Sequence, residues 1–290
     1  MMTPSERAES TEGDVAPEAY LAKLGEAGEG PHDIATAALM LSALDHPNRK
    51  LGPYRAHLSE LGHGARVEAE FSPDAERAAE AVASVIAGRY GYDGDRMQYE
   101  APGNADFLQV IEKRRGLPVA LGILYIHAAR AAGHESSGLF APGHFMLRIA
   151  VKGSEAFVDP FNGGAALDRE RLTSPRMGAA VFAEPPAPGA PSPFEAVSDI
   201  DLLLRLLNNI KGRALKGRDI ARSLEIARRM TLIAPRRAGA WIDLGRLQEA
   251  TGVLSAARSA FERALSLAPA GNALHNEAAI ALQALKRRLN

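Results

Sequence analysis

The chain of 290 residues has no cysteine, a single tryptophan and few aromatic residues, which make up 6% of it. Without cysteine there can be no disulfide bond, no thiolate nucleophile, and no zinc or iron–sulfur site built on sulfur ligands. An excess of one charge is also missing, because 34 Lys and Arg oppose 35 Asp and Glu for a net charge of −1. Any electrostatic partner must therefore meet a local patch, since no basic surface for nucleic acid covers the whole molecule.

Long apolar runs and metal-binding motifs are missing too. The longest apolar run, Leu117 to Ile126, is well short of the ~20 residues of a membrane-spanning helix. The first residues lack the basic-then-apolar pattern of a signal peptide. The 8 histidines show no HExxH motif and no paired spacing. We therefore expect a cytoplasmic protein with no membrane contact, no metal and no cofactor.

The composition divides the chain into four regions. Residues 1–33 carry eight acidic residues against two basic ones, with few large apolar side chains, so we expect residues 1–31 to form a disordered acidic tail. A short helix at 17–24 is the alternative there. Five prolines between Pro185 and Pro193 predict a semi-rigid linker at 184–198. The linker separates a first domain, residues 32–183, from a second, residues 199–290.

The first domain mixes helices and strands. Apolar residues recur at helical spacing after Asp33 and again over 73–90. Pro118 suits the first position of a helix that is apolar on all sides, which predicts a buried central helix over 118–132. Alternating residues over 145–151, a turn at 152–155 and a second strand to Asp159 predict a β-hairpin.

The second domain contains a sequence repeat. Seven residues occupy the spacing of a 34-residue tetratricopeptide repeat: Trp241, Leu244, Gly245, Ala257, Phe261, Ala264 and Pro269. Subtracting 34 residues places Pro235 at the position of Pro269. A third unit begins at Asn272 and stops after about one helix, as a cap would. We expect five helices in antiparallel pairs after Asp199.

Five short segments of the first domain carry a family resemblance: Gly88–Tyr92, Asn104, Arg114–Pro118, Pro142–Phe145 and Val158–Gly164. They resemble the bacterial SirB-type branch of the transglutaminase-like superfamily, which also carries C-terminal tetratricopeptide repeats. The resemblance extends from about Ile34 to the end. It implies an α+β, papain-like fold, with a central helix on a small antiparallel sheet. Enzymes of the superfamily use a cysteine at the start of that helix, a histidine on one strand and an aspartate on the next.

In this sequence the nucleophile of that triad is missing. The central helix starts at Leu117-Pro118-Val119-Ala120, and none of these side chains can attack a carbonyl. His144 and Asp159 remain, and strand parity predicts that they share a face of the hairpin, ~5–8 Å apart. A satisfied core pair without chemistry is the alternative for these two residues.

Four residues are predicted to line the same cleft: Asn104, Arg114, Pro118 and Ala120. Asn104 could instead be a turn or helix-capping residue, and Arg114 could be a solvated charge on a helix.

Two functions fit these residues. The first is a non-catalytic module that binds a protein or peptide through the cleft and the repeats. The alternative is a hydrolase or amide transferase in which His144 activates water or an amine while Asp159 orients the ring. The pattern leaves the partner, the substrate and the oligomeric state open.

The predicted partner site lies on the repeats. Between Arg205 and Arg237 ten basic residues face two acidic ones, a local net charge of +8. This predicts a basic surface for an acidic peptide or for the chain's own acidic tail. Nucleic acid is the weaker alternative, because few aromatic residues lie among these charges. The partner-binding residues are expected to be Arg205, Asn208, Lys211, Lys216 and Arg246.

Overall fold

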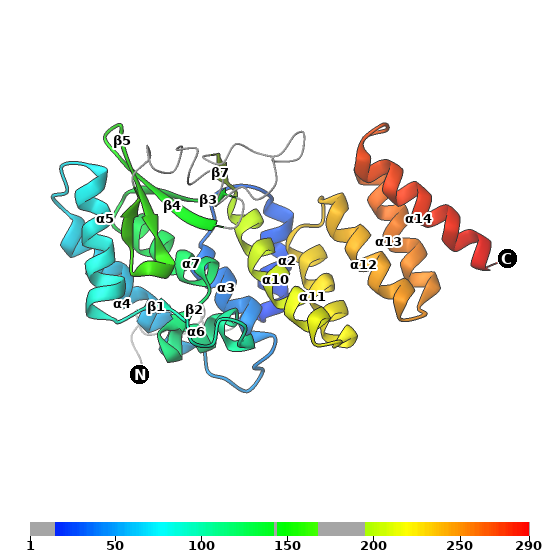
Figure 1. Cartoon of the computed structure of the whole chain (residues 1–290), viewed down its shortest axis with the longest axis horizontal. Coiled ribbons are helices and arrows are strands. Elements are labelled where there is room, and N and C mark those ends of the chain that lie inside the picture. The colour runs from blue at the N-terminus through cyan, green and yellow to red at the C-terminus, as the bar shows by residue number, and fades with distance from the viewer. Residues whose placement is uncertain (1–14, 142–143, 168–194, 290) are drawn as a thin grey trace, which may run out of the picture.

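The computed structural model describes residues 15–141, 144–167 and 195–289. A mixed α and β part holds a central helix against a five-stranded antiparallel sheet, and helices α10 to α14 extend from it to the C-terminus (Figure 1). This arrangement confirms the predicted fold class. Among the described helices, none is long and apolar enough to cross a membrane.

Part of the predicted disordered tail is ordered. Helix α2 spans Pro17–Ala27, with the proline in its first turn. Leu21 and Leu24 are buried in the main core, which supplies the free energy needed to order the helix. The prediction of disorder missed this pair of leucines among polar residues. Residues 1–14 lie outside the described part.

Three of the next four helices begin with an aspartate cap, whereas the fourth, Gly52–Ala69, begins with a proline in its first turn. Asp33, Asp74 and Asp106 each accept a hydrogen bond from a backbone N–H three residues further on. The helices are α3 (Ile34–Ala43), α4 (Gly52–Ala69), α5 (Ala75–Ala83) and α6 (Phe107–Lys113). Helix α5 continues into a π-helical turn, Ser84–Arg89. The helical pattern over 73–90 is thus one element with a widened last turn.

Helix α7, Pro118–Ala131, is the predicted central helix. It packs against α4 on one side and against two strands of the sheet on the other. Gly122 allows the close approach of the sheet, because a Cβ atom at this position would lie 2.3 Å from Cε1 of Phe145. A larger residue at 122 would push the sheet away from α7.

The sheet confirms the predicted hairpin. Strands β4 (His144–Val151) and β5 (Ser154–Asp159) pair antiparallel, and positive φ angles of 49° at Lys152 and 85° at Gly153 close a two-residue turn. The strand order is β6-β5-β4-β3-β7. The remaining strands are β3 (Glu135–Ala141), β6 (Ala165–Leu167) and β7 (Ala196–Val197). A separate two-stranded parallel pair, β1 (Asp93–Gly94) and β2 (Arg115–Gly116), precedes α7.

The five predicted repeat helices are present. They are α10 (Asp199–Lys216), α11 (Ile220–Ile233), α12 (Ala238–Ala250), α13 (Leu254–Leu267) and α14 (Ala273–Leu289). Leu244, Ala257, Phe261 and Ala264 are buried, and Trp241 is partly buried. The ring of Phe261 fills the space above Gly245, where a Cβ atom would lie 2.6 Å from the ring.

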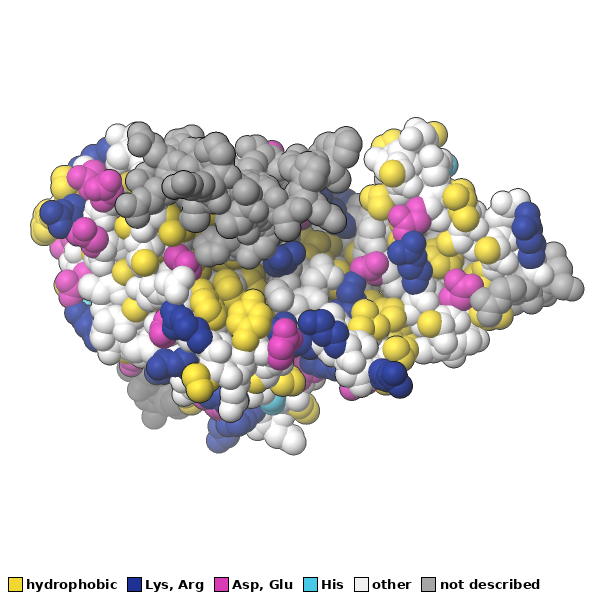
Figure 2. Space-filling view, in the orientation of Figure 1, with side chains coloured by type: hydrophobic (Ala, Val, Ile, Leu, Met, Phe, Trp, Pro, Cys, Tyr) yellow, Lys and Arg dark blue, Asp and Glu magenta, His cyan; other side chains and the backbone are white. Residues whose placement is uncertain are grey.

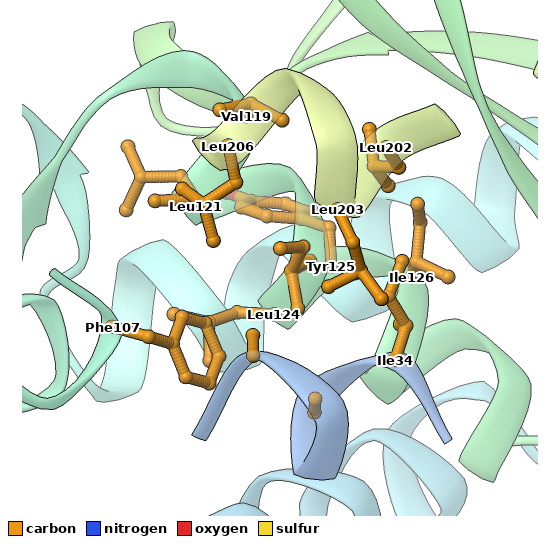
Figure 3. Close-up of a cluster of buried hydrophobic side chains, with 14 of the residues drawn as sticks. Ile34, Phe107, Val119, Leu121, Leu124, Tyr125, Ile126, Leu202, Leu203 and Leu206 are labelled. Carbon is orange, nitrogen blue, oxygen red and sulfur yellow. The ribbon is translucent and has the colours of Figure 1, made fainter. Parts of the chain in front are cut away.

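The main core includes the first two repeat helices. Figure 3 shows Leu202, Leu203 and Leu206 of α10 among the side chains of α7. Ile226 and Met230 of α11 and Ala240 of α12 belong to the same core. The buried side chains Leu244 of α12, Phe261 of α13 and Leu285 of α14 pack instead in smaller clusters. Strand β7, directly before α10, pairs with β3. Within the described segments, α10 and α11 therefore share the core of the first domain.

Candidate functional site

The start of α7 is where a nucleophile would stand. Leu117 occupies the capping position without a side-chain hydrogen bond, and Pro118 follows it. Leu117, Val119 and Ala120 are at most 3% exposed. The backbone N–H of Leu117 donates to the carbonyl oxygen of Asn104 at 2.9 Å. The helix N-terminus is therefore built from buried apolar side chains, none of which has a group that can form an acyl intermediate.

Asp159 lies close to that helix at the end of β5. Its carboxylate accepts hydrogen bonds from the backbone N–H groups of Phe161 (2.9 Å) and Asn162 (3.2 Å). The side-chain amide of Asn162 donates to the other carboxylate oxygen at 2.6 Å. Only 3% of Asp159 is exposed. These bonds make Asp159 the cap of a short 3₁₀ turn, Pro160–Asn162, and fix its orientation.

His144 is the first residue of β4, and its backbone pairs with Ala141. The pair Leu147↔Val158 sets the register of β4 and β5, so Asp159 lies one residue beyond this pair and His144 three residues before it. The side chain of His144 lies outside the described part. The predicted pairing of its ring with Asp159 therefore stays a prediction.

Tyr125 contributes a polar group from the middle of α7. Its hydroxyl is buried and has no hydrogen-bond partner among the described residues. Burial raises the pKa of Tyr125, and the carboxylates of Asp93 and Asp159 raise it further. A Cβ atom at Gly164, where φ is +79°, would lie 2.7 Å from this hydroxyl, so the glycine turn covers it. The phenol is neutral near pH 7 and can donate a hydrogen bond but not act as a base.

The structure separates the other predicted cleft residues. Asn104 is 2% exposed and donates from its side-chain amide to the carbonyl oxygen of Gln98 at 2.7 Å. It therefore ties the 98–104 segment to the start of α7, where Pro118 and Ala120 lie. This contact places Asn104 beside the predicted cleft in a bridging role.

Arg114 points into a different cluster. Its guanidinium contacts His57 and the hydroxyl of Tyr92, and it lies 4.7 Å from the centre of the Tyr92 ring. The hydroxyl of Tyr92 and Nε2 of His57 are 2.8 Å apart. Burial lowers the pKa of His57, and Arg114 lowers it further. The interpretation of Arg114 as a solvated charge is wrong, because its guanidinium contacts His57 of α4 and the ring of Tyr92.

The loop before α6 links the start of α7 to the repeats. Arg96 donates to the carbonyl oxygen of Phe161 at 3.0 Å and to the side chain of Asn162 at 2.7 Å. Tyr99 packs edge-on against Phe161, with ring centres 5.7 Å apart. Arg213 of α10 donates to the carbonyl oxygen of Tyr99 at 3.1 Å. No function was predicted for this loop, whose signal in the sequence is Arg96 and Tyr99 between Gly94 and Gly103.

The predicted partner-binding residues have different surroundings. Arg205 and Asn208 lie on the exposed side of α10, and Lys216 is 75% exposed with Glu100 3.6 Å away. Arg246 of α12 is 60% exposed and pairs with Glu277 at 2.5 Å. Lys211 is buried and paired with Asp243, so the expectation that it contacts a partner is corrected. Removing Lys211 from this pair would leave Asp243 without its cation.

Many of the ten basic residues of the first repeat are used within the molecule. Arg222 and Arg229 clamp Asp45, and Arg213 and Lys216 flank Glu100. The chain's own acidic segment takes part too. Arg237 pairs with Glu29 at 2.9 Å, and Arg236 donates to the carbonyl oxygen of Glu26. Figure 2 shows acidic side chains interspersed with the basic ones on this face of the molecule.

Metal chemistry has no evident centre in the described segments. They contain no group of three or more His, Asp or Glu side chains that could hold a metal ion. Polar groups at the predicted cleft include Asp159, Asn162, Asn104 and the hydroxyl of Tyr125. They can orient and hydrogen-bond a ligand.

Comparisons with known proteins agree with this architecture. A profile of the transglutaminase-like superfamily matches residues 53–208, and one of the tetratricopeptide repeat matches residues 210–290. A UPF0162 protein of Xylella fastidiosa (strain 9a5c) is 28% identical over 239 residues, which cover 81% of this chain and 84% of that relative. A UPF0162 protein of Vibrio cholerae is 28% identical over 132 residues, covering 45% of this chain and 49% of the relative.

A more distant match is F-box only protein 21 of Mus musculus, 30% identical over 83 residues, which cover 29% of this chain and 13% of that protein. No solved structure matches the chain. The superfamily profile spans more than half of the residues, and the fold agrees with it. The chain therefore belongs to the transglutaminase-like superfamily and carries a C-terminal tetratricopeptide repeat region.

Proposed function

We propose that this chain is a non-catalytic transglutaminase-like protein that binds a protein or peptide through its cleft and its repeats. The observation that carries the proposal is the apolar start of α7, where Leu117, Val119 and Ala120 are buried. Acyl transfer through a covalent intermediate needs a nucleophile at this point, next to the positive end of the helix. The capping role of Asp159 supports the same conclusion, since it gives the buried carboxylate a structural task in the turn at 160–162.

The repeat helices offer the surface for a partner. Arg205, Asn208 and Lys216 recur at the spacing of one helix face on α10, and Arg246 lies on α12. Exposed apolar side chains lie on the same set of helices, with Leu215 of α10 42% exposed and Ile280 of α14 68% exposed. This combination suits a peptide that carries acidic residues beside apolar ones. The cytoplasmic location stays a prediction.

An activity assay tests the catalytic half of the proposal. The full chain is incubated with a glutamine-containing peptide and a primary amine, and released ammonia and amine incorporation are measured. We expect no turnover above that of His144→Ala. Turnover that His144→Ala abolishes would instead support the alternative, a hydrolase or amide transferase that uses His144 and Asp159 without a covalent nucleophile.

A binding assay tests the other half. A fluorescent peptide rich in Glu and Leu is titrated with the full chain at low and high salt. Charge reversal in the double variant Arg205→Glu/Lys216→Glu should weaken binding by about tenfold and reduce its salt dependence. Arg228→Glu on α11 is the matched control, because Arg228 is also exposed but lies on the other helix of the pair. Equal weakening by both changes would contradict the α10 site.

A further inference from the structure

A cavity of about 410 Å³ lies between the first domain and the first pair of repeat helices. Its walls come from α3, from the start of α6 and from α10 and α11, which lie near one another in the middle of the molecule (Figure 1). Cavities of roughly 300–1,000 Å³ are the usual size for small-molecule sites. Its lining includes neither Asp159 nor the start of α7, so it is separate from the predicted cleft.

The larger walls of this cavity are aliphatic. Ala38 and Leu41 of α3 face Leu206, Leu207 and Ile210 of α10 across it. These side chains belong to the main core or pack against it. The exposed part of the lining is therefore apolar surface, which favours the apolar body of a ligand over water.

Three carboxylates line the cavity, and each has a partner in the chain. Asp219 accepts a hydrogen bond from the backbone N–H of Arg222 at 2.9 Å. Asp45 is held between the guanidinium groups of Arg222 and Arg229. Asp106 accepts hydrogen bonds from Ser42 at 2.9 Å and from Gln109, and it pairs with His46 at 2.6 Å. These groups compensate one another, so a ligand need not supply a cation.

Arg213 is different, because one of its donors has no hydrogen-bond partner. Its terminal nitrogens donate to the carbonyl oxygens of Asn209 and Tyr99, but its buried Nε–H has no hydrogen-bond partner in the described part of the chain. The nearest carboxylate oxygen, on Glu100, lies 3.6 Å away, beyond hydrogen-bond distance. The Arg213 side chain is 12% exposed and lines the cavity. The Glu100 side chain is 63% exposed, so its pairing with Arg213 is weak, and the cation can pair with an anionic group in the cavity.

We propose that this cavity binds a small molecule with an apolar body and one anionic group. The body lies between α3 and α10, and the anionic group pairs with the guanidinium of Arg213, which lines the cavity. Because the walls belong to both parts of the chain, the bound molecule contacts the first domain and the repeats together. Binding therefore stabilises the packing of α10 and α11 on α3.

Two dyes with related ring systems test the proposal. 1-Anilinonaphthalene-8-sulfonate carries one sulfonate, and N-phenyl-1-naphthylamine lacks it. Both should bind the full chain with one-to-one stoichiometry and gain fluorescence. Arg213→Gln should lower the affinity for the sulfonate dye by about tenfold and change the affinity for the neutral dye by less than about twofold.

Filling the cavity with a larger side chain should abolish the binding of both dyes. Ala38→Phe narrows it from α3, and Ile210→Trp narrows it from α10, so one variant serves if the other fails to fold. Ala250→Phe is the matched control, because Ala250 is exposed on α12 away from the cavity. Circular dichroism and thermal melts identify the folded variants. Undiminished dye binding in a folded filled variant, equal loss of both dyes in Arg213→Gln, or no binding to the unchanged chain would each overturn the proposal.

Discussion

The two parts of the repeat region differ in what they pack against. Helices α10 and α11 belong to the core of the first domain. Helix α12 contributes Ala240 to that core, but most of its buried side chains, and those of α13 and α14, pack in small clusters with the repeat helices beside them. Residues one repeat apart show the cause. Ile226 and Met230 of α11 reach the main core, but the equivalent residues of α13 are Ala260 and Ala264. A sequence repeat of 34 residues therefore does not mark a structural unit here.

The arginines show the same contrast. Arg229 of α11 and Arg263 of α13 are equivalent positions of the repeat, yet Arg229 is 5% exposed and Arg263 lies in solvent. Arg229 is buried because Asp45 of the first domain pairs with it. The first pair of helices thus has both apolar and ionic contacts with the first domain. The outer helices have fewer of them: Ala240 of α12 joins the main core, and Arg237, the capping residue of α12, pairs with Glu29.

The largest expected effect comes from truncating one core residue on each side of this boundary. Phe261→Ala removes the ring that fills the space above Gly245 and should lower the free energy of unfolding by about 3–5 kcal/mol. Leu206→Ala in α10 should cost about 2–5 kcal/mol. Hydrogen exchange should locate the two losses differently, because Phe261 contacts only outer helices.

In Phe261→Ala, faster exchange should be confined to α12, α13 and α14, while α7 and α10 keep their protection. In Leu206→Ala the amides of α7 and α10 should exchange faster. Uniform loss of protection across the chain in Phe261→Ala would show that the outer helices unfold together with the first domain, contrary to the comparison.

The next largest effect tests the ion pairs between Asp45 of the first domain and the arginines of α11. Asp45→Ala leaves Arg222 and Arg229 facing the cavity without their shared carboxylate, and should lower the free energy of unfolding by about 3 kcal/mol. Denaturant melts measure it. The control is Glu262→Ala, because the exposed pair of Glu262 with Arg258 contributes at most about 1 kcal/mol.

Lowering the pH should produce the same loss of stability in the chain without the substitution. Burial acts to raise the pKa of Asp45, but hydrogen bonds and charges from Arg222 and Arg229 outweigh it and hold this pKa below its ordinary value. The stabilisation is therefore complete above about pH 4 and is lost as the pH falls through the lowered pKa. Asp45→Ala should flatten this part of the pH profile, and an unchanged profile would contradict it.

Much of the fold could be predicted because its signals are local. Pro118 before an all-apolar run indicated the central helix, and the alternation before Asp159 indicated the hairpin. The packing of α10 could not be predicted, because a repeat helix that faces another domain has the same amphipathic period as one that faces another repeat. A short helix at 17–24 was only the alternative to disorder, because two leucines among polar residues carry the burial of α2.

The site was predictable only in part. The missing nucleophile follows from the absence of cysteine and from the residues at the start of α7, and the structure places Asp159 next to that helix. Arg114, Tyr92 and His57 come from three separate segments, so no spacing in the sequence could have joined them. The hydroxyl of Tyr125, which has no partner among the described residues, could not be predicted for another reason. In the sequence, a tyrosine in an apolar helix cannot be distinguished from an ordinary core residue.

The smallest expected effect concerns His57, which lies in the first domain and should not affect the outer helices. The groups around this ring are Arg114, Tyr92, Tyr90 and Glu60, and Nδ1 lies 3.7 Å from a carboxylate oxygen of Glu60. Burial and the cation of Arg114 lower the pKa of His57, and Glu60 opposes them only in part. The folded state therefore takes up its proton at lower pH than the unfolded chain does, whose pKa is about 6.5.

Below about pH 6.5 the unfolded chain binds the proton first, so stability should fall as the pH falls, by at most about 1.4 kcal/mol for each pH unit. Above that pH the contribution is constant. His57→Gln should reduce this slope, and hydrogen exchange at pH 5.5 should show the loss in α4 and in the 90–92 segment but not in α12, α13 and α14. If amide exchange in the outer helices accelerated equally, the two regions would be coupled more tightly than their separate cores imply. If the pH dependence of stability were unchanged in His57→Gln, the effect would belong to another group.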